Sequence, residues 1–381
     1  MSDSITYVAM DTHKKEHSVA LVYSQAGEIQ QFTVKNTVKD IAKMVKLVQK
    51  HSAGEVRFCY EAGVCGFTLK RRIEGMGGRC IVIAPSLVPT KPGERIKTDR
   101  RDAKKLLGQF VAGQLTEVYA PDVKQEAARE LTRARQTALE NLKRIRHQIV
   151  KFLTRHGYLY TQGRHWTGRH LEWLRSLVFD LPDLQDVFDL YFTELQHCMQ
   201  RLASVDKQVA QLAQREPYRE IVGPPGDGLR QLLRCFRGID TLTAITSLTE
   251  IFEWGRFASP GVLMSYLGLV PSEYSSGPRR RPGAITKTGN ERVRRLLVEA
   301  GWHYRHRPWV SRELKLRRKD QPQWAIDLAD RAMHRLYQRY WRLLERGKVP
   351  NEAVVAVARE LAGFLWAALR EYELRRMHQV A

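Results

Sequence analysis

The chain has 381 residues, 43% of them hydrophobic, which indicates two or three folded domains and excludes wholesale disorder. Its 63 Lys and Arg against 41 Asp and Glu leave a formal charge of +22, which attracts phosphate polymers. A basic protein of anionic membranes and a ribosome-like structural protein are the alternatives. Nucleic acid is preferred to both, because the apolar content implies folded domains rather than basic tails.

The five cysteines form no C-x-x-C pair and are odd in number. This argues against a zinc site and a disulfide framework, and it predicts a reducing, cytoplasmic environment. The N-terminus lacks a basic region followed by an apolar one, and no apolar run approaches the ~20 residues that span a bilayer. We therefore expect a soluble intracellular protein with no membrane partner.

Residues 1–120 alternate between strand and helix patterns. Strands are expected at 5–11, 17–24, 29–36, 56–63 and 79–85, with helices at 38–51, at 67–78 and after the Pro/Gly-rich stretch 85–95. The order β-β-β-α-β-α-β-α predicts an α/β domain, a mixed sheet covered by helices.

Residues 121–215 predict a helical middle region. The first long helix begins near Asp122, a candidate N-cap. In the second, apolar residues alternate steps of four and three, as in a coiled coil, at Leu184, Phe188, Tyr191, Leu195, Cys198, Leu202, Val205, Val209 and Leu212. This spacing fits an antiparallel pair within one chain and a seam between chains equally well. From the second arrangement we expect a homo-oligomer, a dimer or a tetramer.

Residues 216–381 predict a C-terminal domain, which is mainly α beyond the Gly/Pro-rich linker 220–228. Its aromatic residues recur at helical spacing, and such stripes are typical of a core rather than a ligand cage. The residues concerned are Trp324, Tyr337, Tyr340, Trp341 and Trp366.

Four carboxylates in the first domain are candidates for a metal site. Asp11 and Glu61 lie at the ends of two predicted strands. Asp99 and Asp102, at positions i and i+3, share one face of a predicted helix, with Cβ atoms about 5–6 Å apart. Each alone is more readily structural. Together they would repel unless a cation lay between them, and hard oxygen ligands favour Mg²⁺ or Mn²⁺. The flanking cations that would receive a phosphate polymer are Lys97, Arg100, Arg101, Lys104 and Lys105.

The stretches "AMDTHKKEHSVALV", "CYEAG" and "KTDRRDAKKL" resemble the RuvC-like domain of the DEDD transposases. These form the insertion-sequence family often called IS-one-ten, the bridge-RNA-guided recombinases. The resemblance implies a ribonuclease H-type fold, with Asp11, Glu61, Asp99 and Asp102 in the D, E, D and D positions. It also implies a prokaryotic protein, associated with the nucleoid when bound to DNA.

A second signature of that family is "YLGLVPSEYSSGPRRRPGAITKTGNERVRRLL". The resemblance implies that Ser276 is a nucleophile, although Ser275 beside it is equally hydroxylic. Arg279, Arg280 and Arg281 are suited to neutralise charge that develops on phosphorus.

Further nucleic-acid contacts are expected after this loop and before it. The helix after Asn290 or Thr288 is expected to expose Arg292, Arg294 and Arg295, and Lys287 precedes it. Upstream, "FRGIDTLTAITSL" resembles a helix-hairpin-helix with Asp240 in place of the usual second glycine.

The resulting prediction is a transposase or recombinase that cuts and rejoins double-stranded donor and target DNA. Ser276 would form a transient phosphoserine link, assisted by metal, and the resemblance implies a structured guide RNA that selects the DNA by base pairing. One alternative is a metal-dependent nuclease or Holliday-junction resolvase with an inert serine, and another is a nucleic-acid-binding scaffold without chemistry.

Overall fold

The computed structural model describes residues 5–24, 27–89, 98–222, 232–273 and 282–380. The chain forms two compact units, Met1–Asp122 and Val123–Ala381, with separate hydrophobic cores. Within the described ranges, no helix is both long enough and apolar enough to cross a membrane.

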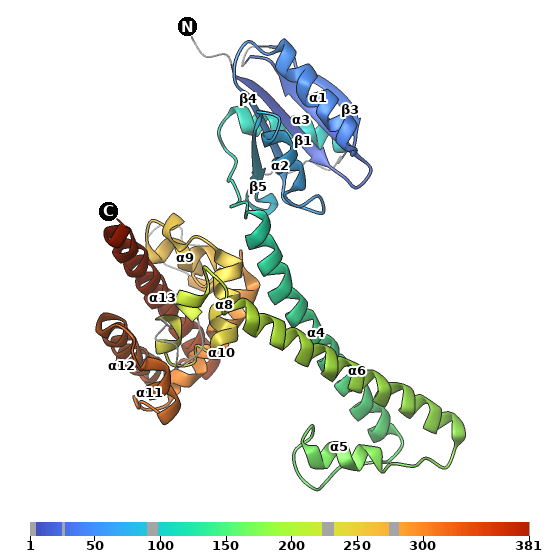
Figure 1. Ribbon diagram of the computed structural model, residues 1–381, viewed down its shortest axis with the longest axis vertical. Coiled ribbons are helices and arrows are strands. Elements are labelled where there is room, and N and C mark those ends of the chain that lie inside the picture. The colour runs from blue at the N-terminus through green and yellow to red at the C-terminus, as the bar shows by residue number, and fades with distance from the viewer. Residues whose placement is uncertain (1–4, 25–26, 90–97, 223–231, 274–281, 381) are drawn as a thin grey trace. The chain divides into compact units, whose positions relative to one another are not determined.

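The N-terminal unit is built on a five-stranded mixed sheet of order β3-β2-β1-β4-β5 (Figure 1). The strands are β1 (Thr6–Thr12), β2 (Glu16–Val22), β3 (Gln30–Lys35), β4 (Val56–Glu61) and β5 (Arg79–Ile83). The first three pair antiparallel through short turns, whereas β1, β4 and β5 are parallel. Parallel neighbours need long crossovers, and these contain the helices α1 (Val38–His51) and α2 (Thr68–Glu74). The predicted mixed sheet and its strand order along the chain are confirmed.

Helices cover both faces of this sheet, because the central strand β1 is apolar on both sides. Val8 and Met10 pack in one core with residues of α1 and α2. Tyr7 and Ala9 point to the opposite face, in a core formed with α3 (Asp99–Val111). Asp11 is the next alternate residue of β1 after Tyr7 and Ala9, so it lies on the same face of the sheet, the face that α3 covers.

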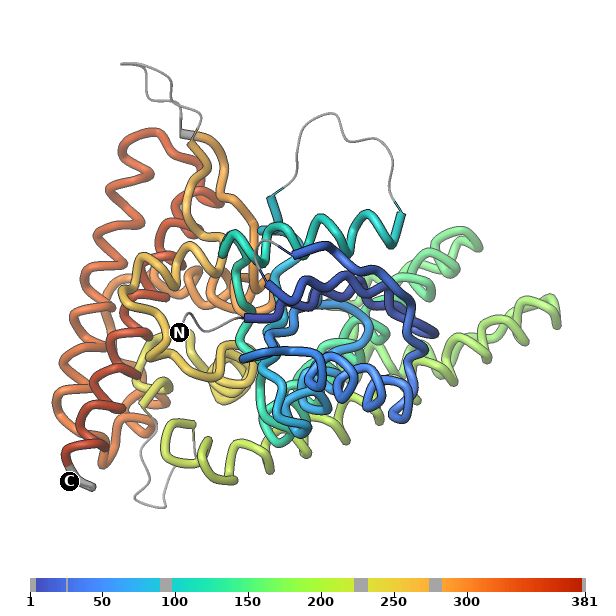
Figure 2. Tube along the Cα trace, turned by 90° about the horizontal axis from the view of Figure 1, so that it is seen from above, coloured from blue at the N-terminus to red at the C-terminus, as the bar shows by residue number. Residues whose placement is uncertain are grey.

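In the C-terminal unit, α4 (Val123–Arg155) and α6 (Pro182–Leu212) run antiparallel and side by side (Figures 1 and 2). Phe152 near the end of α4 stacks on Phe188 near the start of α6, with ring centroids 6.4 Å apart. Arg135, which interrupts the apolar pattern of α4, binds Asp206 of α6 at 2.7 Å. Every a/d position of α6 is buried or half-buried in this arrangement. The seam is thus filled by a helix of the same chain, and a coiled coil between chains is not confirmed.

The short helix α5 (Gly168–Arg175) lies between α4 and α6 in the chain and places His170 in an aromatic cluster. The His170 side chain is buried, and its Nδ1 accepts a hydrogen bond from the Trp166 amide at 3.1 Å. Burial, followed by the charges of His165 and Arg146, lowers the pKa of His170 to about 4. This imidazole is therefore neutral in the folded protein.

We expect the C-terminal unit to lose stability as the pH falls from 6.5 toward 4. In that window the unfolded state protonates His170 and the folded state does not, so the contribution is complete above pH 6.5. Urea unfolding followed by tryptophan fluorescence at pH 7.5 and pH 5 measures the effect. His170→Asn should reduce the pH dependence but not abolish it, because burial also lowers the pKa of His303 in this unit. The exposed control His147→Asn should leave the dependence unchanged. An undiminished dependence in His170→Asn would contradict this assignment.

The rest of the C-terminal unit is mainly helical, as predicted. Its helices are α7 (Arg219–Val222), α8 (Thr241–Ile251), α9 (Pro260–Tyr266), α10 (Glu291–Gly301), α11 (Arg312–Arg318), α12 (Gln323–Glu345) and α13 (Pro350–Val380). The long helix α13 packs on α9, α10 and α12 and contributes an apolar face to a single large core. A two-stranded ribbon that the sequence did not predict, β6 (Pro271–Glu273) with β7 (Pro282–Ile285), flanks residues 274–281.

The aromatic residues of α12 and α13 are mostly part of this core. Tyr340 is buried, Trp324 and Trp366 pack against the core, and Tyr337 is half-buried. Trp341 is 42% exposed, so the prediction of a core residue is wrong at this position.

Candidate functional site

The sheet brings Asp11 and Glu61 to the same edge and the same face. Met10 of β1 pairs with Tyr60 of the parallel strand β4, so Asp11 and Glu61 are the next residues of two adjacent strands. Neighbouring strands lie about 4.8 Å apart, and residues in register point to the same side of a parallel pair. That side is the one covered by α3, because Ala9 and Cys59 two residues earlier both lie in the core with α3.

The first turn of α3 brings the other two carboxylates to this face. Thr98 is its N-cap and accepts a hydrogen bond from the amide of Arg101, which fixes where the helix begins. Asp99 and Asp102 lie in the first turn, where the helix dipole favours negative charge. The next turns carry buried residues that press α3 against the sheet, namely Ala103, Leu106 and Leu107.

Asp11 and Asp99 meet at a third residue, His13. The Nε2 atom of His13 lies 3.3 Å from Asp11 Oδ2 and 3.4 Å from Asp99 Oδ2. One possible ligand atom from each of the three residues lies within 4.8 Å of the others. His13 is not among the ligands that the sequence predicts. Its signal is the spacing Asp-x-His at a strand end, because alternate residues of an extended chain lie on one side.

The surroundings of Asp11 disfavour its ionised form, and the pKa of this carboxyl is raised. Burial raises the pKa of Asp11, His13 lowers it by charge and hydrogen bonding, and Asp99 and Asp102 raise it. Asp102 is therefore near enough to repel Asp11, although the ligand cluster itself consists of Asp11, His13 and Asp99. Glu61 is half-buried and is related to Asp11 by strand register.

The donor set fits a divalent cation. Two carboxylates and an imidazole converge on one point, and carboxylate oxygens suit Mg²⁺ and Mn²⁺ while imidazole is a better ligand for Mn²⁺ than for Mg²⁺. The side chains of Asp99 and His13 are 63% and 49% exposed, so an ion and a phosphate could reach them from solvent.

The predicted basic contacts on α3 are mostly exposed. Arg100, Arg101 and Lys104 are exposed and Lys105 is half-buried, while Lys97 lies outside the described residues. The carbonyl of Arg100 accepts a hydrogen bond from Gln31 of β3 at 2.8 Å, which holds this end of α3 to the sheet. These cations are neighbours of the aspartates in the sequence of the first two turns of α3.

The predicted nucleophile and its arginines lie outside the described residues. This applies to Ser275, Ser276, Arg279, Arg280 and Arg281. Asn290 is the N-cap of α10, as predicted, and its side chain accepts a hydrogen bond from the amide of Val293.

The prediction that α10 exposes three arginines is correct only for Arg292. Arg294 is half-buried and donates to the carbonyls of Leu267 and Thr288, both at 2.8 Å. Arg295 is half-buried and binds Gln136 of α4 at 2.7 Å and Glu299 at 2.9 Å. Helical spacing predicts position on a helix but not the loops and helices that pack there. Lys287, before the helix, is exposed.

The predicted helix-hairpin-helix departs from that motif. A 3₁₀ turn (Leu232–Cys235) stands where its first helix would end, and Asp240 caps α8 by accepting from the amide of Thr243 at 2.7 Å. Gly238 has φ +78°, and a side chain there would lie 2.7 Å from the carbonyl of Ala300. The hairpin therefore requires glycine at this position, and the aspartate acts as a helix cap.

Two family models of transposases match this chain. Residues 8–157 match a transposase model named for the DEDD domain of IS110, and residues 230–315 match the model "Transposase IS116/IS110/IS902 family". The chain is 39% identical to the putative transposase y4qE of Sinorhizobium fredii, over 96% of this chain and 88% of that one.

A second relative is the transposase for insertion sequence element IS1533 of Leptospira borgpetersenii. It is 32% identical over 90% of this chain and 97% of its own length. Transposases of this kind act on DNA by cutting and rejoining it. On these similarities, which extend over nearly the whole chain, the protein belongs to the IS116/IS110/IS902 family of insertion-sequence transposases.

Proposed function

We propose that this transposase cuts and rejoins DNA through a serine nucleophile, Ser276, assisted by divalent metal held by Asp11, Glu61, Asp99 and Asp102. The observation that carries the metal part is the convergence of Asp11, His13 and Asp99. We add His13 to the proposed ligands on this basis. The order β3-β2-β1-β4-β5, with acids at adjacent strand ends, supports a ribonuclease H or RuvC-like fold for this unit.

In the proposed reaction the Oγ atom of Ser276 forms a bond to phosphorus while the bond from phosphorus to a deoxyribose oxygen breaks. The serine loses its proton, the departing oxygen gains one, and a later attack by a DNA hydroxyl reverses both changes and restores the serine. Arg279, Arg280 and Arg281 neutralise the charge on the phosphate oxygens. When bound, Mg²⁺ or Mn²⁺ supplies positive charge that stabilises the phosphodiester in its transition state. The residues that hold it also keep the basic helix α3 close to the phosphates.

A trapping experiment tests the serine. Wild-type protein is incubated with labelled duplex DNA that carries the ends of its own element, denatured, digested with protease and analysed by mass spectrometry. We expect a phosphodiester on the peptide containing Ser276, and its loss in Ser276→Ala but not in Ser275→Ala. Cleaved DNA with free ends and full activity in Ser276→Ala would favour a metal-dependent nuclease or Holliday-junction resolvase instead. Unchanged DNA activity in Asp11→Asn and Glu61→Gln would leave only a binding scaffold.

A structured guide RNA and a homo-oligomer are further parts of the proposal. The RNA would select donor and target DNA by pairing, and sequencing the RNA that copurifies with the protein from its native locus tests it. We expect a dimer or a tetramer, although α6 already uses its a/d residues within the chain. Light scattering that gives a monomer both alone and with nucleic acid would remove this part.

A further inference from the structure

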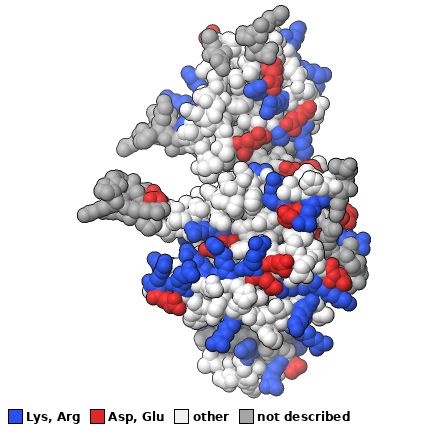
Figure 3. Space-filling model, turned by 90° about the vertical axis from the view of Figure 1, so that its left-hand side faces the viewer, with Lys and Arg blue, Asp and Glu red and all other residues white. Residues whose placement is uncertain are grey.

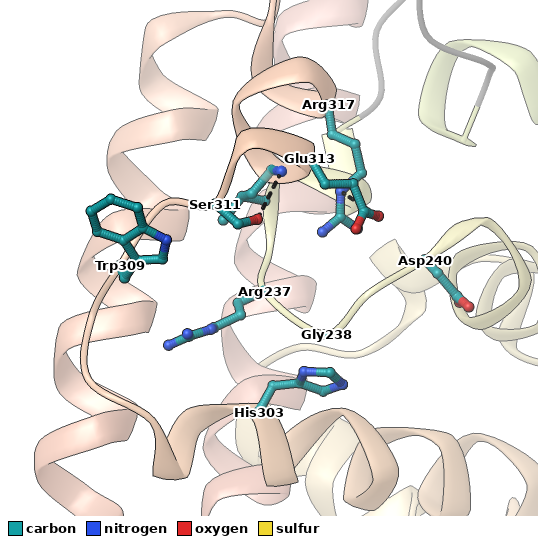
Figure 4. Close-up of a pocket in the computed structure, with 9 residues that line it drawn as sticks. Arg237, Gly238, Asp240, His303, Trp309, Ser311, Glu313 and Arg317 are labelled. Carbon is teal, nitrogen blue, oxygen red and sulfur yellow. Dashed lines mark hydrogen bonds and ion pairs between the residues drawn. The ribbon is translucent and has the colours of Figure 1, made fainter.

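Two pockets of the C-terminal unit share one wall, the segment 302–309, "WHYRHRPW". The first, of about 340 Å³, lies between this segment, the hairpin 237–240 and α11 (Figure 4). The second, of about 740 Å³, lies between the segment and α12. They adjoin, because Arg237 of the first pocket donates to the carbonyls of His306 and Arg307, which line the second, at 3.1 and 3.0 Å.

The first pocket contains an exposed indole and an arginine without a carboxylate in contact, although Asp240 and Glu313 also line it. Arg237 contacts no carboxylate of a described residue, and it extends toward the side on which Trp309 lies (Figure 4). Arg317, on the α11 side, has Glu313 at 3.9 Å. Trp309 is 67% exposed and makes no hydrogen bond or ring contact within the described part of the chain. Packing of the protein does not account for an indole at this position.

The second pocket repeats this combination. Arg305, Arg307 and Arg342 are exposed and contact no acidic side chain among the described residues, while Glu345 lines the same pocket. Trp341 donates its indole N–H to the carbonyl of Arg305 at 3.0 Å, which fixes the ring while leaving it 42% exposed. On the side of the C-terminal unit where α12 and α13 lie, Lys and Arg gather on the surface (Figure 3).

From these contacts we infer that the two pockets bind an unpaired stretch of nucleic acid, its bases against Trp309 and Trp341 and its phosphates at Arg237, Arg305 and Arg342. Exposed aromatic rings stack on unpaired bases whatever their identity, and guanidinium groups without acidic partners bind phosphate. The volume of the first pocket suits a single nucleotide. Bases inside a duplex are stacked on one another and cannot enter such pockets, which favours a single strand of RNA or DNA.

Anisotropy with fluorescent probes tests the inference on the full chain, in EDTA so that no DNA is cut. The probes are oligouridylate, oligothymidylate and a mixed-sequence duplex. Trp309→Ala and Trp341→Ala should each weaken binding of unpaired probes roughly tenfold and duplex binding less than about twofold. Trp309→Phe should retain most of the affinity, because it keeps an aromatic face. Arg342→Ala should weaken unpaired probes, whereas Arg331→Ala, an exposed arginine on α12 outside both pockets, should not.

Equal losses on all three probes, or no loss in Trp309→Ala and Trp341→Ala, would overturn the inference. A loss confined to oligouridylate would identify the strand as RNA, and one confined to oligothymidylate would identify it as DNA; both support the site. Unchanged thermal unfolding of the variants ensures that the loss is not one of folding. The inference rests on the proposed function only in taking nucleic acid as the ligand. Ser276→Ala should bind all probes like the wild type, so a failure of the serine chemistry is distinguishable.

Discussion

Asp11→Asn is expected to lower the rate of DNA cleavage roughly a hundredfold to a thousandfold, a loss comparable to removal of one group that stabilises transition-state charge. The reason is that a carboxylate oxygen of Asp11 lies within 4.8 Å of possible ligand atoms of His13 and Asp99, at the proposed metal site. Initial cleavage rates on element-end DNA, with Mg²⁺ or Mn²⁺, measure the effect. Thermal unfolding with and without either ion should show stabilisation by metal in the wild type and a smaller shift in the variant.

The fold should survive this substitution. Burial raises the pKa of Asp11, so at neutral pH its ionised form opposes folding, and an uncharged side chain of the same shape removes that cost. In EDTA the variant should therefore unfold at the wild-type temperature or above it. Glu28→Gln, at an exposed acid before β3 in the same unit, is the matched control and should keep both activity and metal response. Normal cleavage and a normal metal shift in Asp11→Asn would contradict the proposed site.

Glu250→Ala is expected to lower the free energy of unfolding of the C-terminal unit by about 3 kcal/mol. The carboxylate is 1% exposed and binds Arg133 of α4 through both oxygens, at 2.7 and 2.9 Å. Asn290, the cap of α10, donates to it at 2.9 Å. Removal of Glu250 leaves the half-buried Arg133 with only the exposed Glu130, 3.7 Å away. We expect the low end of the range for broken buried pairs, because Arg133 keeps this contact and is 32% exposed.

Urea unfolding followed by tryptophan fluorescence measures this loss, because all eight tryptophans of the chain lie in the C-terminal unit. Glu352→Ala is the control, since its 3.1 Å ion pair with Lys348 is exposed and should contribute less than about 1 kcal/mol. A loss below about 1 kcal/mol in Glu250→Ala would mean that this cluster does not hold α4, α8 and α10 together.

The same carboxylate gives the unit a second acid sensitivity. Burial would raise the pKa of Glu250, but hydrogen bonds and charge from Arg133, together with Asn290 and Arg292, hold it below its usual value. Its contribution to stability is therefore present above pH 4.5 and is lost as the pH falls below that value. Because Asn290 is the N-cap of α10 and donates to Glu250, this cluster also holds the start of α10 against α8.

Local sequence patterns were sufficient to predict the N-terminal sheet and to select its candidate acids. Alternating apolar strands and helical stripes are local patterns, and short turns and long crossovers between them leave few ways to pair the strands. The positions of Asp11 and Glu61 at strand ends, and of Asp99 and Asp102 one turn apart, follow from these periods alone. The caps Thr98 and Asn290 are local for the same reason.

Which side chains contact one another depends on the packing of distant elements and could not be predicted from these local patterns. The tertiary structure added His13 to the acids and paired the a/d residues of α6 with α4 of the same chain. It also drew Arg294 and Arg295 into internal hydrogen bonds and left Trp309 and Trp341 exposed. Periodicity specifies the face of a helix or strand on which a residue lies. The residue that it contacts is usually distant in the chain, and packing of all the elements together determines which one it is.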